Sequence, residues 1–268
     1  MRILLLLPVL MGVLVSCGPA TKQPPSEEVA LPTTVADRAK MAKLYASYLE
    51  NLDPRFPTSC VREQGKVNPA DEAPTDTAFF VFREQLREIV AQKDAFALIA
   101  NTSKNVQIGH GEENGIDAFI RQWELDSEAK IPQSPLWLEL KNILDLGGTF
   151  NGRRDYFEAP YVGGCWSGSY DAFEYGTVTG SGVRLRSGTD LDTRVVKKLS
   201  YDVVKYLEET PIELTLGGQT HPWIKVALLD GTEGYLYGKF YSSPVGLRAG
   251  FTKDAAGNWQ LNVLLSGD

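Results

Sequence analysis

The side chains best suited to nucleophilic or metal chemistry in this sequence are two histidines, His110 and His221, and three cysteines. No cluster of His, Cys or carboxylate residues has the spacing of a metal site, so we expect neither a metal nor another cofactor. His110 lies in "QIGHGEENG", a pattern typical of a solvated turn, although Glu112 and Glu113 follow it closely.

Two pairs of adjacent acids, Glu112-Glu113 and Glu208-Glu209, raise the possibility of paired acid and base catalysis as in glycosidases. Adjacent residues on a strand or helix face different ways. Nothing in the sequence indicates a desolvated carboxyl group with a raised pKa. We therefore interpret both pairs as solvated charge.

The first sixteen residues predict a secretory signal peptide, because Arg2 precedes an apolar run from Ile3 to Val15. That run is shorter than the about 20 apolar residues of a spanning helix. The tetrad from Leu14 to Cys17 resembles the bacterial lipobox. This resemblance implies that Cys17 receives a diacylglyceryl group and becomes the mature N-terminus. The alternative is a plain signal peptide with a chance cysteine at its edge.

The formal net charge is −7, and removal of Arg2 with the signal makes it one unit more negative. Basic residues are nowhere clustered enough to neutralise phosphates, so we expect no nucleic acid partner. Membrane contact is expected through the acyl chains only. Gly18 stands where Asp would favour inner-membrane retention in enteric bacteria, so resemblance to that sorting rule implies the outer membrane, facing the periplasm.

Once Cys17 is acylated, Cys60 and Cys165 are the cysteines that remain. Export places them in an oxidising compartment, where an even pair favours a disulfide. The sequence therefore predicts a bond between Cys60 and Cys165.

Residues 17–36 are rich in proline and poor in large apolar groups, which predicts a disordered tether. From Asp37 to Leu52 apolar residues recur at helical spacing. Further helices are expected from near Asp76, in "DAFALIA", in "NGIDAFIRQWEL", and from Leu136 to Leu146, with a strand in "NVQIG". For the helix at Leu136, Ser134 suits the N-cap, Pro135 the first helical position, and Gly147-Gly148 the stop. We interpret residues 37–165 as one α+β domain.

From Phe173 onward the helical pattern almost disappears. A strand from Val183 to Arg186 stops at a Ser187-Gly188 turn, and the apolar strands "RVVKKL", "DVVKYLEE", "WIKVALL" and "GYLYGKF" follow. Five short strands with tight turns are expected to curl into a small all-β barrel over residues 173–242.

These strands resemble the bacterial SH3-like (SH3b) domain, whose signature is roughly Leu-Asn-Val-Arg-Ser-Gly-Pro, a later Val and Leu, then Trp-x-Lys-Val and Gly-Trp-Val. The corresponding residues are Val183 to Thr189, Val195 and Leu199, Trp223 to Val226, and Gly234 to Leu236. The resemblance covers residues 176–242. Thr189 departs from the usual Pro, Tyr201-Asp202 replaces the usual Lys-Gly turn, and "ELTLGGQTHP" looks like an insertion beside the expected groove.

The resemblance implies a non-enzymatic envelope lipoprotein whose SH3b-like module binds a cell-wall peptide or an envelope protein. A small barrel can hold an extended peptide between aromatic faces and loop backbone. The candidate groove residues are Tyr201, Trp223, Tyr235 and Tyr237. Their alternative role is to fill the core of the barrel itself.

A second function that the resemblance suggests is a cysteine-type peptidoglycan hydrolase, or an accessory subunit of one. Cysteine peptidases that act on peptidoglycan stems often accompany SH3b domains, and Cys165 in "GGCWSG" would be the nucleophile. Its base would be His221, which lies in the barrel insertion, where no papain-like strand fits. We therefore favour the non-enzymatic function.

Residues 243–268 alternate through Leu247, Ala249 and Phe251, turn at "DAAGN", and alternate again from Trp259 to Leu265. This pattern predicts a β-hairpin with one apolar face. Because a lone hairpin is marginal in water, we expect it to pack on the α+β domain.

Overall fold

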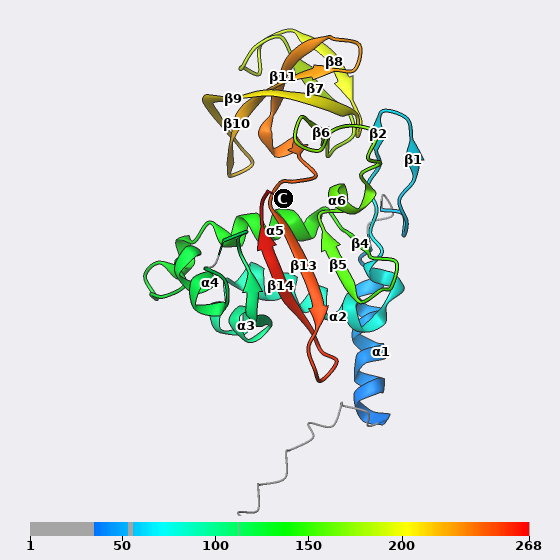
Figure 1. Ribbon diagram of the computed structural model, residues 1–268, viewed down its shortest axis with the longest axis vertical. Coiled ribbons are helices and arrows are strands. Elements are labelled where there is room, and N and C mark those ends of the chain that lie inside the picture. Colours follow the sequence, from blue (N-terminus) through cyan, green and yellow to red (C-terminus); the bar gives the residue numbers. More distant parts are fainter. Residues whose placement is uncertain (1–34, 53–55, 112, 268) are drawn as a thin grey trace, which may run out of the picture. The chain divides into compact units, whose positions relative to one another are not determined.

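The C-terminal hairpin forms the middle of a five-stranded sheet whose other strands come from the first 160 residues (Figure 1). The computed structural model describes residues 35–52, 56–111 and 113–267. The predicted signal peptide, Cys17 and all but the last two residues of the predicted tether lie outside these residues. Those last two already belong to the first helix, Val35–Leu49.

The described residues form helices mainly in the first half of the chain and strands mainly in the second. The helices are α1 (Val35–Leu49), α2 (Thr77–Gln92), α3 (Ala95–Ala100), α4 (Ile116–Gln122), α5 (Leu136–Asp145) and α6 (Tyr161–Cys165), with 3-10 turns at Ala73–Thr75, Ile131–Gln133 and Gly238–Phe240. The strands before residue 180 are β1 (Arg62–Glu63), β2 (Lys66–Val67), β3 (Thr102–Gln107), β4 (Thr149–Phe150), β5 (Tyr156–Ala159) and β6 (Tyr175–Val178). The later strands are β7 (Val183–Arg186), β8 (Val195–Leu199), β9 (Val203–Leu216), β10 (Gln219–Leu228), β11 (Glu233–Tyr237), β12 (Tyr241–Ser242), β13 (Arg248–Lys253) and β14 (Trp259–Leu265).

Helices α1 to α5 and the sheet β3-β14-β13-β5-β4 make up what we call the helical lobe. Strand β14 pairs in parallel with β3 and antiparallel with β13, which in turn pairs antiparallel with β5. Helices α2 and α5 cover one face of this sheet, whereas the face turned to the viewer in Figure 1 has no helix over it. The core between them is rich in aromatic rings; Phe79 of α2 lies 4.2 Å from Phe157 and 4.9 Å from Trp259 between ring centroids.

Helix α5 starts at Leu136, as the expected range from Leu136 to Leu146 has it, and ends one residue early at Asp145, but its N-cap lies one residue later than predicted. Pro135 takes the N-cap position and Leu136 is the first helical residue. The Ser134 hydroxyl still accepts a hydrogen bond from the Leu136 N–H at 3.2 Å. Gly147 ends the helix with φ of +67°, where a Cβ atom would lie only 2.7 Å from the Ala70 carbonyl oxygen. The predicted glycine stop therefore has both a conformational and a steric cause.

The second sheet has the order β12-β6-β9-β10-β11-β7-β8, and we call it the β-lobe. It is antiparallel and curled, with a core of aliphatic side chains that includes Leu185, Val204, Val226 and Leu236. Its end strands, β12 and β8, do not pair with each other in the described chain, so the sheet is a half-barrel. The segment that looked like an insertion extends the β9–β10 hairpin, which turns at Gly217-Gly218.

A separate apolar cluster, which we call the joint, connects the two lobes. Its buried members are Val67, Tyr161, Val162 and Val203. Backbone hydrogen bonds reinforce it: the Val67 N–H donates to the Tyr201 carbonyl at 2.9 Å, and the Val203 N–H donates to the Gly65 carbonyl at 2.8 Å. The β1–β2 hairpin, from the first part of the chain, is therefore bonded directly to the β-lobe.

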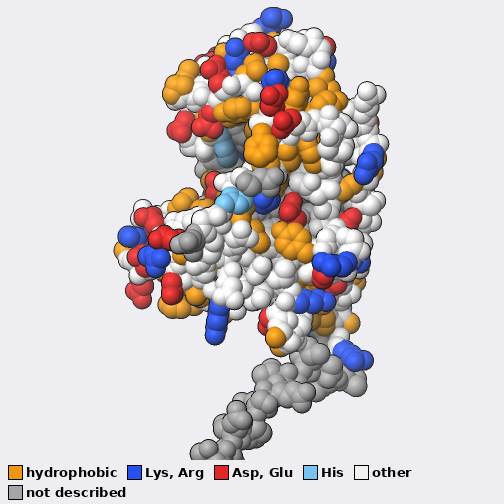
Figure 2. Space-filling model, in the orientation of Figure 1, with side chains coloured by type: hydrophobic (Ala, Val, Ile, Leu, Met, Phe, Trp, Pro, Cys, Tyr) orange, Lys and Arg blue, Asp and Glu red, His pale blue; other side chains and the backbone are white. Residues whose placement is uncertain are grey.

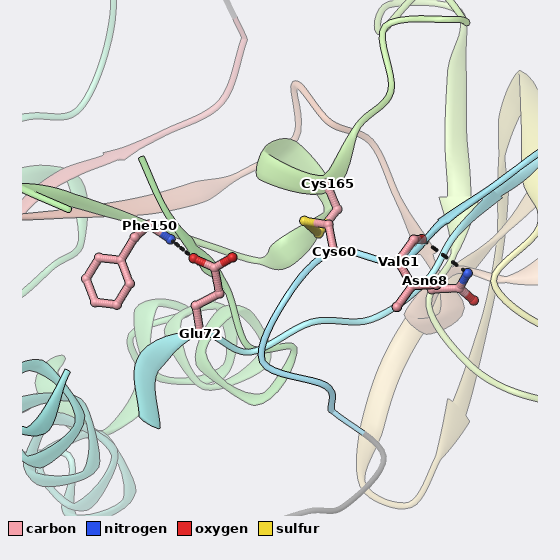
Figure 3. Close-up of a disulfide and its surroundings, with 6 residues drawn as sticks. All are labelled: Cys60, Val61, Asn68, Glu72, Phe150 and Cys165. Carbon is pink, nitrogen blue, oxygen red and sulfur yellow. Dashed lines mark hydrogen bonds between the residues drawn. A yellow bond between two sulfur atoms is a disulfide. The ribbon is translucent and has the colours of Figure 1, made fainter. Parts of the chain in front are cut away.

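The disulfide between Cys60 and Cys165 lies beside the joint (Figure 3), and the predicted pairing is confirmed. Cys60 precedes β1 and Cys165 is the last residue of α6, with a Cα–Cα distance of 5.4 Å. Nearby, the Phe150 N–H donates to the Glu72 carboxylate at 2.9 Å. A crosslink that closes a loop of about 100 residues stabilises by about 4.7 kcal/mol in the chain-entropy model, which is an upper figure.

Truncation after Ser242 tests how far the helical lobe depends on the C-terminal hairpin. Each large side chain that becomes buried stabilises by about 1.5–3 kcal/mol, whereas a whole domain is stable by only about 5–15 kcal/mol. Loss of Phe251, Trp259 and Leu261, all buried, should therefore unfold the helical lobe. Thermal melting and light scattering would show an early transition with aggregation.

The matched control for this truncation is Ala255→Ser, which changes only an exposed residue in the turn between β13 and β14 and should melt as the parent does. A truncated chain that melted at the parent temperature would show that the hairpin contributes nothing essential to the helical lobe.

Candidate functional site

A cleft of about 1070 Å³ lies where the helical lobe faces the β-lobe. The helical lobe and its flanking loops contribute apolar and charged side chains, among them Tyr48, Leu52, Phe56, Asp71, Phe80, Arg83, Glu84, Arg87, Asp145 and Tyr161. The β-lobe contributes Arg184, Arg186, Leu191, Tyr201, Leu216, Trp223, Tyr237 and Phe240. We call this feature the interlobe cleft. Its volume is at the upper end of the roughly 300–1,000 Å³ that ligand pockets span.

Three of the four predicted groove residues, Tyr201, Trp223 and Tyr237, line the interlobe cleft, whereas Tyr235 does not. Trp223 and Tyr237 are only 2% and 5% exposed, and their ring centroids lie 6.3 Å apart. The Tyr237 hydroxyl donates to the Gln219 carbonyl at 2.7 Å. These two rings are thus held in place and expose little surface, while Tyr201 and Phe240 are half-buried. That any of them touches a ligand remains a prediction.

Tyr201 occupies the left-handed backbone region, with φ of +61°. Such a conformation costs a residue other than glycine about 1–3 kcal/mol unless its surroundings enforce it. Here the Tyr201 carbonyl accepts from the Val67 N–H at 2.9 Å and from the Thr177 hydroxyl at 3.2 Å. These two hydrogen bonds hold the backbone of Tyr201 in this conformation.

The opposite wall of the cleft contains a buried ion pair. The Arg83 guanidinium, on α2, donates to both oxygens of Asp71 at 2.6 Å, and the two side chains are 2% and 9% exposed. Arg83 also pairs with Glu84 at 2.9 Å. The Asp71 N–H donates to the Pro57 carbonyl at 2.8 Å, so the pair holds the segment before α2 against the helix.

Arg87 lies one turn further along α2 and shares the Glu84 carboxylate at 3.5 Å. Its Nη2 donates to the Leu144 carbonyl, while its buried Nε has no partner in the described structure. Burial, and then the neighbouring charge of Arg83, lower the pKa of the Arg87 guanidinium. Arg83 was not among the residues predicted from the sequence, although the sequence contains a signal for it. Arg83 lies four residues after Phe79 and three before Leu86, so it falls on the apolar face of the predicted helix.

Tyr161 lines the cleft from the joint and is fully buried. Its hydroxyl has no hydrogen-bond partner in the described structure. Burial, and then the neighbouring Tyr201, raise the pKa of the Tyr161 phenol, which therefore remains a neutral donor at neutral pH. An unpartnered buried hydroxyl costs about 1–3 kcal/mol, so the apolar packing of the Tyr161 ring at the joint has to offset this cost.

The alternative function expected from the sequence, a cysteine-type hydrolase, would need Cys165 as its nucleophile and His221 as its base. In the disulfide Cys165 has no free thiol to act as a nucleophile. His221, on β10, packs edge-on against Tyr237 with ring centroids 5.3 Å apart. Burial, and then repulsion by Lys239, lower the pKa of the His221 imidazole, so the ring is neutral at pH 7.

The other polar candidates lie away from the cleft. His110, Glu113, Glu208 and Glu209 are exposed, and Glu112 lies outside the described residues. Among residues 35–52, 56–111 and 113–267, no group of His, Cys, Asp and Glu is arranged to hold a metal ion. Nor does any helix in these ranges have the length and hydropathy to cross a membrane. Figure 2 shows basic and acidic side chains mixed over one face, without a large patch of one sign.

Comparison of the chain with protein-family models, with curated proteins and with solved structures finds no match.

Replacement of Arg83 by Met tests the buried ion pair. The change leaves Asp71 buried and unpaired, and breaking a buried pair in this way costs about 3–5 kcal/mol. Urea unfolding should show a lower midpoint with an unchanged slope.

The matched control for the ion pair is Lys141→Met, which removes the Lys141–Asp145 pair, whose side chains are 55% and 47% exposed. Its effect should stay below about 1 kcal/mol. Equal effects of the two substitutions would mean that Arg83 contributes no more than a surface charge.

Proposed function

We propose that this protein is a non-enzymatic cell-envelope lipoprotein that binds a peptide segment, from the cell wall or from an envelope protein, in the interlobe cleft. The observation that carries the proposal is that Tyr201, Trp223 and Tyr237, singled out by the SH3b resemblance, line one large cleft. An extended peptide has the shape for such a groove, because its backbone can bond to loop groups while its side chains pack on ring faces and edges.

Rigidity of the cleft supports a binding role. Both lobes are tied at the joint, and the disulfide lies beside it. A site whose walls are already in place loses less conformational entropy when a ligand binds. On this proposal the helical lobe supplies half of the binding surface, so the peptide preferences of an isolated SH3b-like module do not carry over directly.

Attachment to the membrane is a separate part of the proposal and rests on the lipobox resemblance at Cys17. Replacement of Cys17 by Ala should prevent acylation and leave the protein unprocessed or soluble. Cell fractionation with an alkaline wash, together with mapping of the mature N-terminus, measures this. A Cys17→Ala protein that stayed with the membrane, with its N-terminus elsewhere, would rule out the lipid anchor and the outer-membrane location that follows from it.

Co-sedimentation with purified peptidoglycan tests binding in the cleft. The mature protein should pellet without releasing soluble fragments. Tyr201→Asn should weaken pelleting by roughly tenfold, since an aromatic anchor contributes on the order of 1–2 kcal/mol and Asn tolerates the left-handed backbone. The control Phe96→Ala removes a ring that is 79% exposed and outside the cleft, and should pellet normally.

Two outcomes would change the proposal. Soluble fragments released by the pure protein would favour the hydrolase function. If the protein does not pellet, a pulldown from envelope extract is carried out with the parent protein and with Tyr201→Asn. A protein that the parent recovers and Tyr201→Asn loses would be a partner bound in the cleft. Recovery of no such protein would rule out peptide binding.

A further inference from the structure

Two arginines on β7, Arg184 and Arg186, line the interlobe cleft without a counter-charge. Arg186 is only 6% exposed, and its single hydrogen bond joins Nη1 to the Thr193 carbonyl at 2.8 Å. Within the part of the chain that the structure describes, neither arginine forms an ion pair with a carboxylate. No guanidinium nitrogen of Arg186 is among the buried atoms without a partner, so its unbonded nitrogens remain accessible. A cation with so little exposure and no paired carboxylate favours an anion at that point.

The carboxylates that line the cleft do not pair with Arg184 or Arg186, because each forms an ion pair with another cation. Asp71 and Glu84 bind Arg83, and Glu84 also lies 3.5 Å from Arg87. Asp145 pairs with Lys141. Among the described residues that line the cleft, Arg184 and Arg186 are therefore the cations without a paired carboxylate.

A purely structural role for Arg186 would be to hold the turn between β7 and β8 through Thr193. That role uses one of the five N–H donors of a guanidinium and needs no charge, so a neutral amide side chain would serve as well. The remaining donors of Arg186 have no acceptor in the described structure. A planar guanidinium with free donors matches a carboxylate, which can accept two parallel hydrogen bonds.

Tyr161 lines the same cleft, and its hydroxyl is buried without a hydrogen-bond partner in the described structure. Because this oxygen is itself inaccessible, the two arginines alone specify the chemistry of the ligand. A carboxylate would satisfy them, whereas a ligand with only cationic or donor groups would not.

We propose that the β7 side of the interlobe cleft is a carboxylate-binding site, and that the peptide bound there carries an acidic side chain or a free C-terminus that contacts Arg184 and Arg186. This inference rests on the proposed peptide-binding function and specifies the chemistry of its ligand. On this proposal Arg186 makes the bidentate contact with the carboxylate. Arg184, which is exposed, contributes a second positive charge at the rim of the cleft.

The test uses the detergent-solubilised mature protein and a synthetic library of random hexapeptides, each made with a free and with an amidated C-terminus. Recovered peptides should be enriched in Asp, Glu or free C-termini. For one selected acidic peptide, Arg186→Gln and Arg184→Gln should each weaken binding by about tenfold, as expected for one charge-assisted contact. The neutral analogue of that peptide should bind parent and variants equally.

Arg153→Gln is the matched control, because Arg153 is 85% exposed and lies outside the cleft, and it should leave binding of the acidic peptide unchanged. If Arg186→Gln does not fold, the exposed Arg184 carries the test. Two results would overturn the carboxylate site and leave the peptide-binding function standing. In one, the recovered peptides are not enriched in acidic groups. In the other, both β7 variants keep the preference for acidic peptides. Recovery of no peptide at all would overturn both the site and the function.

Discussion

The contact on which this structure depends is the joint, where Val67, Tyr161, Val162 and Val203 are buried between the lobes. The chain passes from the helical lobe to the β-lobe after α6 and returns after β12, so two connections alone would hold the lobes together. The joint adds a packed apolar contact, two backbone hydrogen bonds and the adjacent disulfide. Because the interlobe cleft takes its walls from both lobes, its shape exists only while the joint is intact.

The joint also explains why polar groups in the cleft are left without partners. Tyr161, which lines the cleft, is buried as a member of the apolar cluster, and its hydroxyl has no hydrogen-bond partner in the described structure. Tyr201 is held in a strained backbone conformation by its bond to Val67. Packing at the joint thus offsets the free-energy cost of the unpartnered Tyr161 hydroxyl and of the Tyr201 backbone conformation. Such local costs are typical of functional sites.

Much of the fold was predictable because its signals are local. Helical spacing gave α1 and α2, alternation gave the strands of the β-lobe and the hairpin of β13 and β14, and the stop at Gly147 follows from backbone freedom alone. The disulfide was predicted from the two cysteines that remain if Cys17 is acylated, and the pairing of Cys60 with Cys165 is confirmed. The half-barrel form of the second sheet is shown, and its SH3b identity remains a prediction.

The second wall of the cleft was not predictable, because it depends on contacts between distant segments. No local sequence pattern predicts that Asp71 contacts Arg83 or that Tyr161 and Tyr201 line the same cleft. Both facts depend on how the whole chain folds. The same holds for Arg186. The sequence showed Arg186 only as a strand residue within a stretch that resembles the SH3b signature. Its charge stands out only in the structure, because no carboxylate of the described residues pairs with it.

The insertion of the β-lobe between β5 and β13 sets an order of folding. Strands β6 to β12 are continuous in sequence, so the β-lobe has all of its strands as soon as residue 242 has emerged from the ribosome. The helical lobe must wait for the last strands, β13 and β14, because they lie between β3 and β5 in its sheet. Pairings between distant segments form slowly, since the connecting chain loses entropy before any contact compensates for it. Until these strands pair, the apolar faces of α2 and α5 lack their sheet, and exposed apolar surface of this kind favours aggregation.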